Sequence, residues 1–160
     1  MKIKLLISFL IFISCSSNTT TNIIEVNQNI LNNLENLETN ESINIDSNNY
    51  TIINYWASWC LECIEEHQYL IQLSETKGFE NQVYFVSFQD SEENAIEFIN
   101  QYGRGEINYV TDPESKVAIY SGVFGVPETH ILFNNQIIKK FIGPLSLGDL
   151  QEIIISYSNE

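Results

Sequence analysis

Positively charged side chains are scarce in this 160-residue sequence. Seven Lys and Arg residues stand against 21 Asp and Glu residues, so the formal net charge at pH 7 is −14. A protein that binds nucleic acid needs a basic surface to neutralise the phosphates. We therefore expect no nucleic-acid partner.

Cysteine is also sparse, with Cys15, Cys60 and Cys63 as its three positions. The last two form a pair, and if Cys15 has a separate role no further cysteine is left for a structural disulfide. The two histidines and the cysteines do not supply four ligands at the spacing of a zinc site. We expect no metal, and no cofactor other than the cysteine pair itself.

The apolar run at the start of the chain, residues 5–13, is too short to span a bilayer comfortably as a permanent helix. Lys2 and Lys4 precede this run and Ser14-Cys15 follow it, which is typical of an export signal. A cysteine after a small residue at this point matches a bacterial lipoprotein signal, in which Cys15 becomes the lipidated first residue. An ordinary signal cut nearby and an uncleaved anchor are the alternatives.

The chain is expected to have three parts. These are a signal peptide at 1–14, a flexible tether at 15–29 and one domain at 30–160. Residues 16–29 are rich in Ser, Thr and Asn and have few apolar side chains, which is typical of a flexible segment. The length and the 44% apolar content suit one compact domain. With a lipid on Cys15, the tether would hold that domain close to a membrane.

Strand and helix patterns alternate along the domain. A weak helical spacing at 30–37 and a short strand at 43–45 come first. Apolar and β-branched runs predict strands at 50–56, 83–88 and 107–110. Helical patterns follow them at 60–77, 91–103 and 112–122, and a hairpin at 131–142 leads into a last helix at 146–157. This order predicts an α/β fold.

The pair Cys60 and Cys63 lies where the strand at 50–56 runs into a helix. Unpaired backbone N–H groups and the positive end of the helix dipole favour the thiolate of the first cysteine. A disulfide across two intervening residues would stabilise the fold little, and the other ligands of a metal site are missing. A redox function is therefore favoured over an inert disulfide or half of a metal site.

The element order, the Trp59-Cys60-x-x-Cys63 motif and Val126-Pro127 resemble the thioredoxin fold, a central mixed β-sheet flanked by helices. Proteins of this fold carry a cis-proline at the position of Pro127, close to the cysteine pair. The segments 63–70 and 122–129 resemble the cytochrome c maturation thiol:disulfide interchange proteins, the CcmG/DsbE family, within the TlpA/ResA-like group. The similarity covers about 43–157.

This resemblance implies a membrane-tethered thiol:disulfide oxidoreductase on the periplasmic side of a bacterial membrane. It would keep the haem-site cysteines of apocytochrome c reduced and receive electrons from a transmembrane thiol reductase. A general TlpA/ResA-like reductase of other exported proteins and a redox-silent binding module are the alternatives. A monomer is expected. The dipeptide Leu61-Glu62 departs from the family, which usually has proline between the cysteines.

The expected mechanism assigns nucleophilic attack on a substrate disulfide to Cys60 and resolution of the mixed disulfide to Cys63. Glu62, Glu65, Glu66 and Glu128 are expected near the pair, and no Lys or Arg falls between Cys60 and Leu73. Negative charge raises the pKa of a thiol and destabilises its thiolate. Because a less stable reduced form has a lower reduction potential, we expect a reductant.

Other residues receive narrower interpretations. Glu66 matches an acidic position of the family and would tune the cysteine pKa values or move a proton; a solvated helix glutamate is the plain alternative. Trp59, Val126, Pro127 and Glu128 are the expected substrate-binding residues. Asn54 occupies the place of a buried acid in ordinary thioredoxins. Trp56 is expected in the core, and His67 and His130 are expected to be ordinary helix and strand residues.

Overall fold

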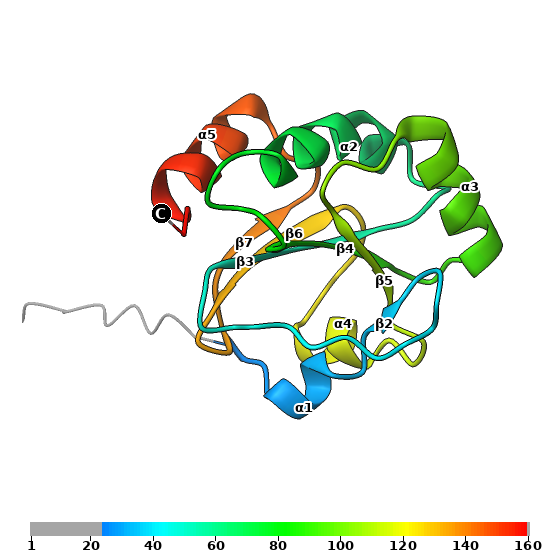
Figure 1. The fold of residues 1–160 in the computed structure, drawn as a ribbon, viewed down its shortest axis with the longest axis horizontal. Helices are drawn as coiled ribbons and strands as arrows, with labels where there is room; N and C mark the ends of the chain where they lie inside the picture. The colour runs from blue at the N-terminus through cyan, green and yellow to red at the C-terminus, as the bar shows by residue number, and fades with distance from the viewer. Residues whose placement is uncertain (1–23, 160) are drawn as a thin grey trace, which may run out of the picture.

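A seven-stranded mixed sheet forms the centre of the protein in the computed structural model, which describes residues 24–159 (Figure 1). The strands are β1 (Ile24–Glu25), β2 (Glu35–Asn36), β3 (Thr51–Trp56), β4 (Val83–Ser87), β5 (Asn108–Thr111), β6 (Glu128–Phe133) and β7 (Gln136–Ile142). Their order is β1-β7-β6-β3-β4-β5-β2. Strands β3, β4 and β5 are parallel, β6 is antiparallel to β3, and β7 is antiparallel to β6.

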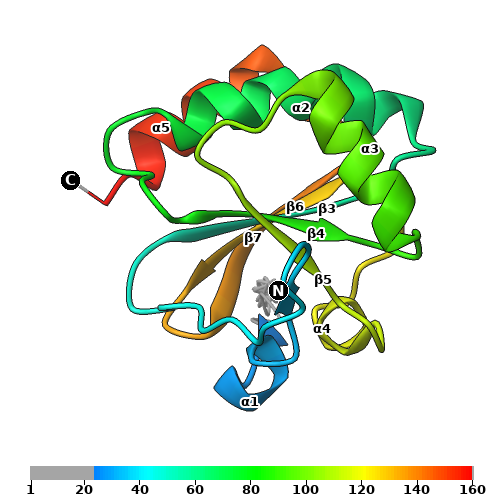
Figure 2. The same ribbon diagram turned by 45° about the vertical axis from the view of Figure 1, so that its right-hand side comes forward.

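Helices cover both faces of this sheet (Figures 1 and 2). One face carries α2 (Leu61–Ser74), α3 (Glu92–Tyr102) and α5 (Leu147–Ser156), and the other carries α1 (Gln28–Leu31) and α4 (Lys116–Tyr120). The predicted fold class, a mixed sheet flanked by helices, is confirmed.

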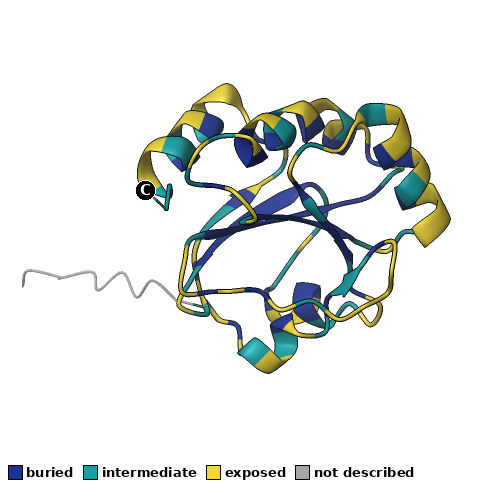
Figure 3. Cartoon of the chain, in the orientation of Figure 1, coloured by how far each residue is buried: buried dark blue, intermediate teal, exposed yellow. Residues whose placement is uncertain are grey.

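The central strand β3 is buried along its whole length, as Figure 3 shows. Its alternating side chains divide between two apolar clusters, because successive strand residues point to opposite faces of a sheet. Ile52 and Trp56 pack on the side of α2, with Phe85, whereas Ile53 and Tyr55 pack on the side of α1 and α4. A strand covered on both faces explains the continuous apolar run in the sequence.

Helix termini follow the signals in the sequence, with one difference. Ser91 and Ser146 cap α3 and α5 with their side chains, and α3 ends at Gly103, whose φ of 95° suits glycine. The helix expected from Asp112 starts later, at Lys116. Asp112 lies before the helix, and its Oδ2 accepts a hydrogen bond from the N–H of Ala118 in α4.

The N-terminal region differs from the expected tether. Residues 24–29 belong to the domain, because β1 pairs with β7 and Val26 is fully buried beneath the sheet. Only the first part of the helical spacing at 30–37 is helical. Leu34 lies just before β2 and Leu37 just after it, and both are buried. This stretch is not helical because β2 pairs with β5.

The predicted signal peptide at 1–14, Cys15 and the rest of the predicted tether up to residue 23 lie outside the described residues. Within 24–159, none of the helices has the length and apolar character needed to cross a membrane.

Candidate active site

The cysteine pair lies at the N-terminus of α2, where the sequence placed it. Cys60 is the N-cap residue in an extended conformation, and its Sγ accepts a hydrogen bond of 3.2 Å from the N–H of Cys63. The two cysteines are joined as a disulfide. The same N–H group would stabilise a thiolate on Cys60 after reduction, because it points at the sulfur from the positive end of the helix.

The two cysteines differ in exposure. Cys60 is 7% exposed and Cys63 is completely buried. Trp59 and Leu61, on either side of Cys60, are both more than 60% exposed. A substrate can therefore reach Cys60 across an apolar surface, whereas Cys63 can meet only a group already bound to Cys60. This difference agrees with the roles of nucleophile and resolving cysteine.

Glu66 is buried, with 1% of its surface exposed, and is not a solvated helix residue. Its Oε1 accepts a hydrogen bond of 2.8 Å from Nδ2 of Asn54, and its Oε2 accepts one of 2.7 Å from the N–H of Leu145. Burial raises the pKa of Glu66 to about 7, although both hydrogen bonds act to lower it. The carboxyl group can thus take up and release a proton near neutral pH.

Glu66 and Cys63 are three residues apart on one helix and both are buried, so they share a helix face. An open groove of about 520 Å³ lies beside Glu66. Its lining comes from α2 and from the segment before and at the start of α5, namely Glu65, Glu66, Tyr69 and 144–148. The groove gives solvent an approach to this carboxyl group.

The peptide bond between Val126 and Pro127 is cis, as the resemblance implied. Pro127 is buried immediately before β6, and Val126 is half-buried against the apolar cluster that contains Cys60 and Cys63. Thr129, two residues later, accepts a hydrogen bond of 2.9 Å from Asn54. Asn54 therefore links the strand after the cis-proline to Glu66 on α2.

Glu128 was expected to bind substrate, but the structure buries it completely. Its Oε2 accepts a hydrogen bond of 3.0 Å from the N–H of Phe124, and its Oε1 lies 2.6 Å from Nε2 of His130 and 3.6 Å from Nζ of Lys140. Burial raises the pKa of Glu128, but these hydrogen bonds and the Lys140 charge outweigh burial and leave the pKa below its usual value. Buried in this way, Glu128 holds the loop before the cis-proline through its hydrogen bond with Phe124, and its contact with substrate stays a prediction.

His130 is a partner of this carboxylate. A carboxylate can only accept, so Nε2 of His130 carries the hydrogen between them, and burial lowers the pKa of the imidazole. Lys140 also donates to the carbonyl oxygens of Ser121 and Gly122. The spacing of Glu128 and His130 could have predicted their contact from the sequence, because strand residues two apart point to the same side.

Phe124 is a surface residue that sequence reasoning did not select. Its side chain is 86% exposed between Val123 and Gly125, in the loop that Glu128 holds. Its position in a loop with glycine on one side could have indicated an exposed aromatic side chain. Trp56 is in the core as expected, stacked on Phe85, and His67 is a buried helix residue whose Nε2 lies 2.9 Å from the carbonyl oxygen of Gly103.

Metal ligands are not gathered in the part of the chain that the structure describes. No group of three or more His, Cys, Asp or Glu side chains there could hold a metal ion.

A cysteine pair capping a helix, with a cis-proline at the start of an antiparallel strand of a mixed sheet, defines a thioredoxin-like protein. The chain belongs to the AhpC/TSA family, whose model matches residues 25–141.

Curated relatives carry the name that the sequence motifs suggested. The chain is 32% identical over 106 residues to the thiol:disulfide interchange protein CycY of Rhizobium leguminosarum bv. viciae, covering 66% of this chain and 56% of that protein. It is 34% identical over 88 residues to the thiol:disulfide interchange protein DsbE of Escherichia coli K12, covering 55% and 46%. The chain thus spans about half the length of these relatives. The predicted resemblance to the DsbE group is confirmed.

The fold also matches solved structures. A thioredoxin-like protein from Aeropyrum pernix superposes with a TM-score of 0.65 at 22% identity, covering 77% of this chain and 87% of that one. This likeness confirms the thioredoxin-like fold.

Proposed function

We propose that this protein is a thiol:disulfide oxidoreductase that donates electrons to disulfides of exported proteins. The observation that carries the proposal is the arrangement of Cys60 at the helix N-terminus, Cys63 buried behind it and Glu66 buried one turn later with a pKa of about 7. The names of the curated relatives, thiol:disulfide interchange proteins, support it.

The reaction starts from the reduced pair. The Cys60 thiolate attacks one sulfur of the substrate disulfide, forms a mixed disulfide with it and releases the other substrate sulfur as a thiolate. Cys63 then loses its proton and attacks Sγ of Cys60. The Cys60–Cys63 disulfide forms, and the second substrate sulfur leaves as a thiol after protonation. The substrate gains two electrons and the proton of Cys63; the first released thiolate takes a second proton from solvent, which balances the proton that Cys60 lost on forming its thiolate.

Glu66 would handle the proton of Cys63. Cys63 is completely buried, so water reaches its thiol poorly, and an ionisable group on the same helix face is the available acceptor. A pKa near 7 suits a group that accepts a proton in one step and returns it in another. Asn54 and Leu145 hold the carboxyl group in place and themselves carry no titratable proton.

The proposed direction of electron flow is reduction of the substrate. Glu62 and Glu65 are exposed on the first turns of α2, and that helix contains no Lys or Arg. Acidic surroundings destabilise the thiolate form of Cys60 and lower the reduction potential. The proposed substrate is apocytochrome c with its paired haem-site cysteines, and a transmembrane thiol reductase would supply electrons.

The proposed location is the periplasmic side of a bacterial membrane, with a lipid on Cys15 as the attachment. The apolar run at 5–13 followed by Ser14-Cys15 supports it. The mass of the mature N-terminus tests this point directly: diacylglycerol on Cys15 is the expected result, and a free N-terminus at another residue would contradict it.

A mixed-disulfide trap tests the function. In cells that carry Cys63→Ser, Cys60 should remain covalently joined to substrates, because no resolving thiol is left. We expect c-type cytochrome precursors with two closely spaced cysteines among the trapped partners. Other exported proteins alone would indicate a general reductase. The variant Cys60→Ser is the control, and equal biological activity of Cys60→Ser/Cys63→Ser and wild type would indicate a redox-silent binding module.

A further inference from the structure

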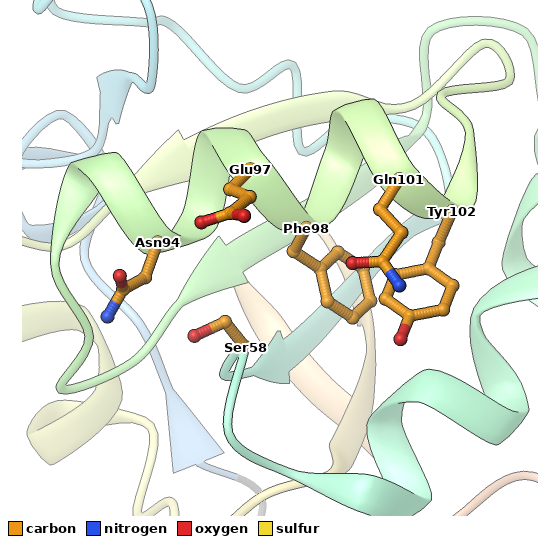
Figure 4. A pocket seen from close by; sticks show the side chains of 6 residues that line it. All are labelled: Ser58, Asn94, Glu97, Phe98, Gln101 and Tyr102. Carbon is orange, nitrogen blue, oxygen red and sulfur yellow. The ribbon is translucent and has the colours of Figure 1, made fainter.

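A small polar cleft opens between the turn before the active-site helix and α3, shown in Figure 4. Its volume is about 210 Å³, below the usual range of cofactor and drug-sized sites, so it suits one side chain of a polypeptide. The lining residues are Ser58, Asn94, Glu97, Phe98, Gln101 and Tyr102.

The cleft has a fixed floor and a fixed rim. Phe98 forms the floor, is 3% exposed and packs on Trp56 with ring centroids 4.4 Å apart. On the rim, the N–H of Ser58 donates a hydrogen bond of 2.6 Å to Oδ2 of Asp90, which joins the turn to the segment before α3. A ligand would therefore meet a preformed surface.

The polar groups around this floor are unused within the protein. Within residues 24–159, the side-chain oxygen and nitrogen atoms of Ser58, Asn94, Glu97, Gln101 and Tyr102 form no hydrogen bond or ion pair with another residue. Four of the lining residues, at positions 94, 97, 98 and 101, share one face of α3 by their spacing. Figure 4 shows these side chains gathered around one opening.

One wall of the cleft is close to Cys60 along the chain. Ser58 is two residues before Cys60, so their Cα atoms are at most about 7 Å apart. In an extended substrate, side chains two residues apart point to the same side at about the same separation. When the substrate cysteine is bonded to Cys60, the side chain two positions away from that cysteine can reach the cleft.

Charge decides which side chain fits. Glu97 is the one charged residue that lines the cleft. Ser58, Asn94 and Gln101 line it too and offer further side-chain oxygens to a cation. The rings of Phe98 and Tyr102 add aromatic surface, which also attracts cations. We propose that this cleft binds a Lys or Arg side chain of the substrate, two residues from the reacting cysteine. The proposal rests on the oxidoreductase function proposed above.

Matched peptides test the specificity. Three disulfide-bonded peptides would differ only at the position two residues from the cysteine, which carries Lys, Gln or Glu. We expect the reduced wild-type protein to favour the Lys peptide over the Gln peptide about three- to fivefold in kcat/KM, the scale of one partly exposed ion pair. Glu97→Gln should remove most of that preference.

The acidic charge of the whole protein could also favour a cationic peptide, and Glu93→Gln controls for this. Glu93 lies on the same helix, is exposed and does not line the cleft, and the substitution removes the same charge. We expect this variant to keep the Lys preference. An equal loss of preference in Glu93→Gln and Glu97→Gln, or no preference in wild type, would overturn the proposal.

A binding measurement separates this proposal from the oxidoreductase function. The same peptides with Ser in place of Cys would be titrated into the oxidised protein, with NMR of the side-chain NH2 groups of Asn94 and Gln101 as readout. Shifts with the Lys peptide that are absent with the Gln peptide are expected even if no peptide is turned over. Unchanged NH2 signals with the Lys peptide would refute the cleft, whatever the turnover results.

Discussion

Glu66 takes its properties from three separate segments of the chain. It belongs to α2, but Asn54 of β3 and the backbone of Leu145 before α5 hold its two oxygens. Burial among them raises its pKa to about 7. A carboxyl group with such a pKa is a proton carrier at neutral pH, whereas the same residue in solvent would be permanently ionised.

The raised pKa of Glu66 predicts a pH dependence of stability. Between about pH 4.5 and pH 7 the folded protein keeps this proton, whereas the unfolded chain has lost it. The free energy of unfolding of wild type should therefore fall as the pH rises through this range, by about 3 kcal/mol relative to Glu66→Gln, which cannot titrate. Denaturant unfolding of both oxidised proteins at several pH values measures this, and parallel pH profiles would contradict the raised pKa.

Glu128 should be important for stability, because its carboxylate compensates buried and half-buried donors. Glu128→Ala leaves the N–H of Phe124 and the imidazole of His130 without their acceptor and Lys140 without its counter-ion. We expect a loss of about 2 to 4 kcal/mol of unfolding free energy. Glu65→Ala, an exposed substitution on α2, should change it by less than about 0.5 kcal/mol. Similar values for the two variants would show that the buried cluster is not stabilising.

At the scale of elements, α2 combines a helix N-terminus that favours a thiolate with a sequence that opposes one. The helix dipole and the N–H of Cys63 stabilise a thiolate on Cys60, whereas the acidic residues of the first turns destabilise it. Leu61-Glu62 thus contributes one exposed apolar residue and one charge to the site. We therefore expect Leu61 to offer apolar contact surface to a substrate and Glu62 to lower the reduction potential.

Removing the acid between the cysteines should make the protein more oxidising. Glu62→Gln would stabilise the Cys60 thiolate and raise the reduction potential by about 10 to 30 mV, which corresponds to roughly 0.5 to 1.4 kcal/mol. Equilibration with glutathione at several ratios, followed by mass spectrometry of alkylated protein, measures the shift. Glu75→Gln, at the far end of α2, should leave the potential unchanged. A fall in the potential of Glu62→Gln would refute the electrostatic explanation.

At the scale of the whole molecule, acidic charge dominates. The net charge is −14, and the Lys and Arg ion pairs of the described residues are mostly at the surface, where each contributes little. The apolar clusters on the two faces of the sheet therefore supply the stability, against repulsion between like charges.

Salt should stabilise this protein. Raising NaCl from about 10 mM to about 150 mM shortens the Debye length from roughly 30 Å to 8 Å and screens the repulsion. We expect the thermal midpoint at pH 7 to rise with salt. At pH values near the sequence pI of about 4.3 the increase should vanish, because the net charge is then close to zero. A midpoint that falls with salt at pH 7 would mean that ion pairs stabilise the fold more than repulsion destabilises it.

The sequence by itself determined the order of strands and helices from residue 51 onward and the place of Cys60 and Cys63, and the family resemblance implied the cis-proline; the short strand expected at 43–45 did not form. The elements and the cysteine pair depend on local signals, namely apolar periodicity and helix caps. Tertiary structure alone decided that Glu66 and Glu128 are buried, that residues 24–25 join the sheet and that a cleft lies beside Ser58. Burial and pKa depend on which distant segments meet, and Leu145 meets Glu66 across 79 residues of chain.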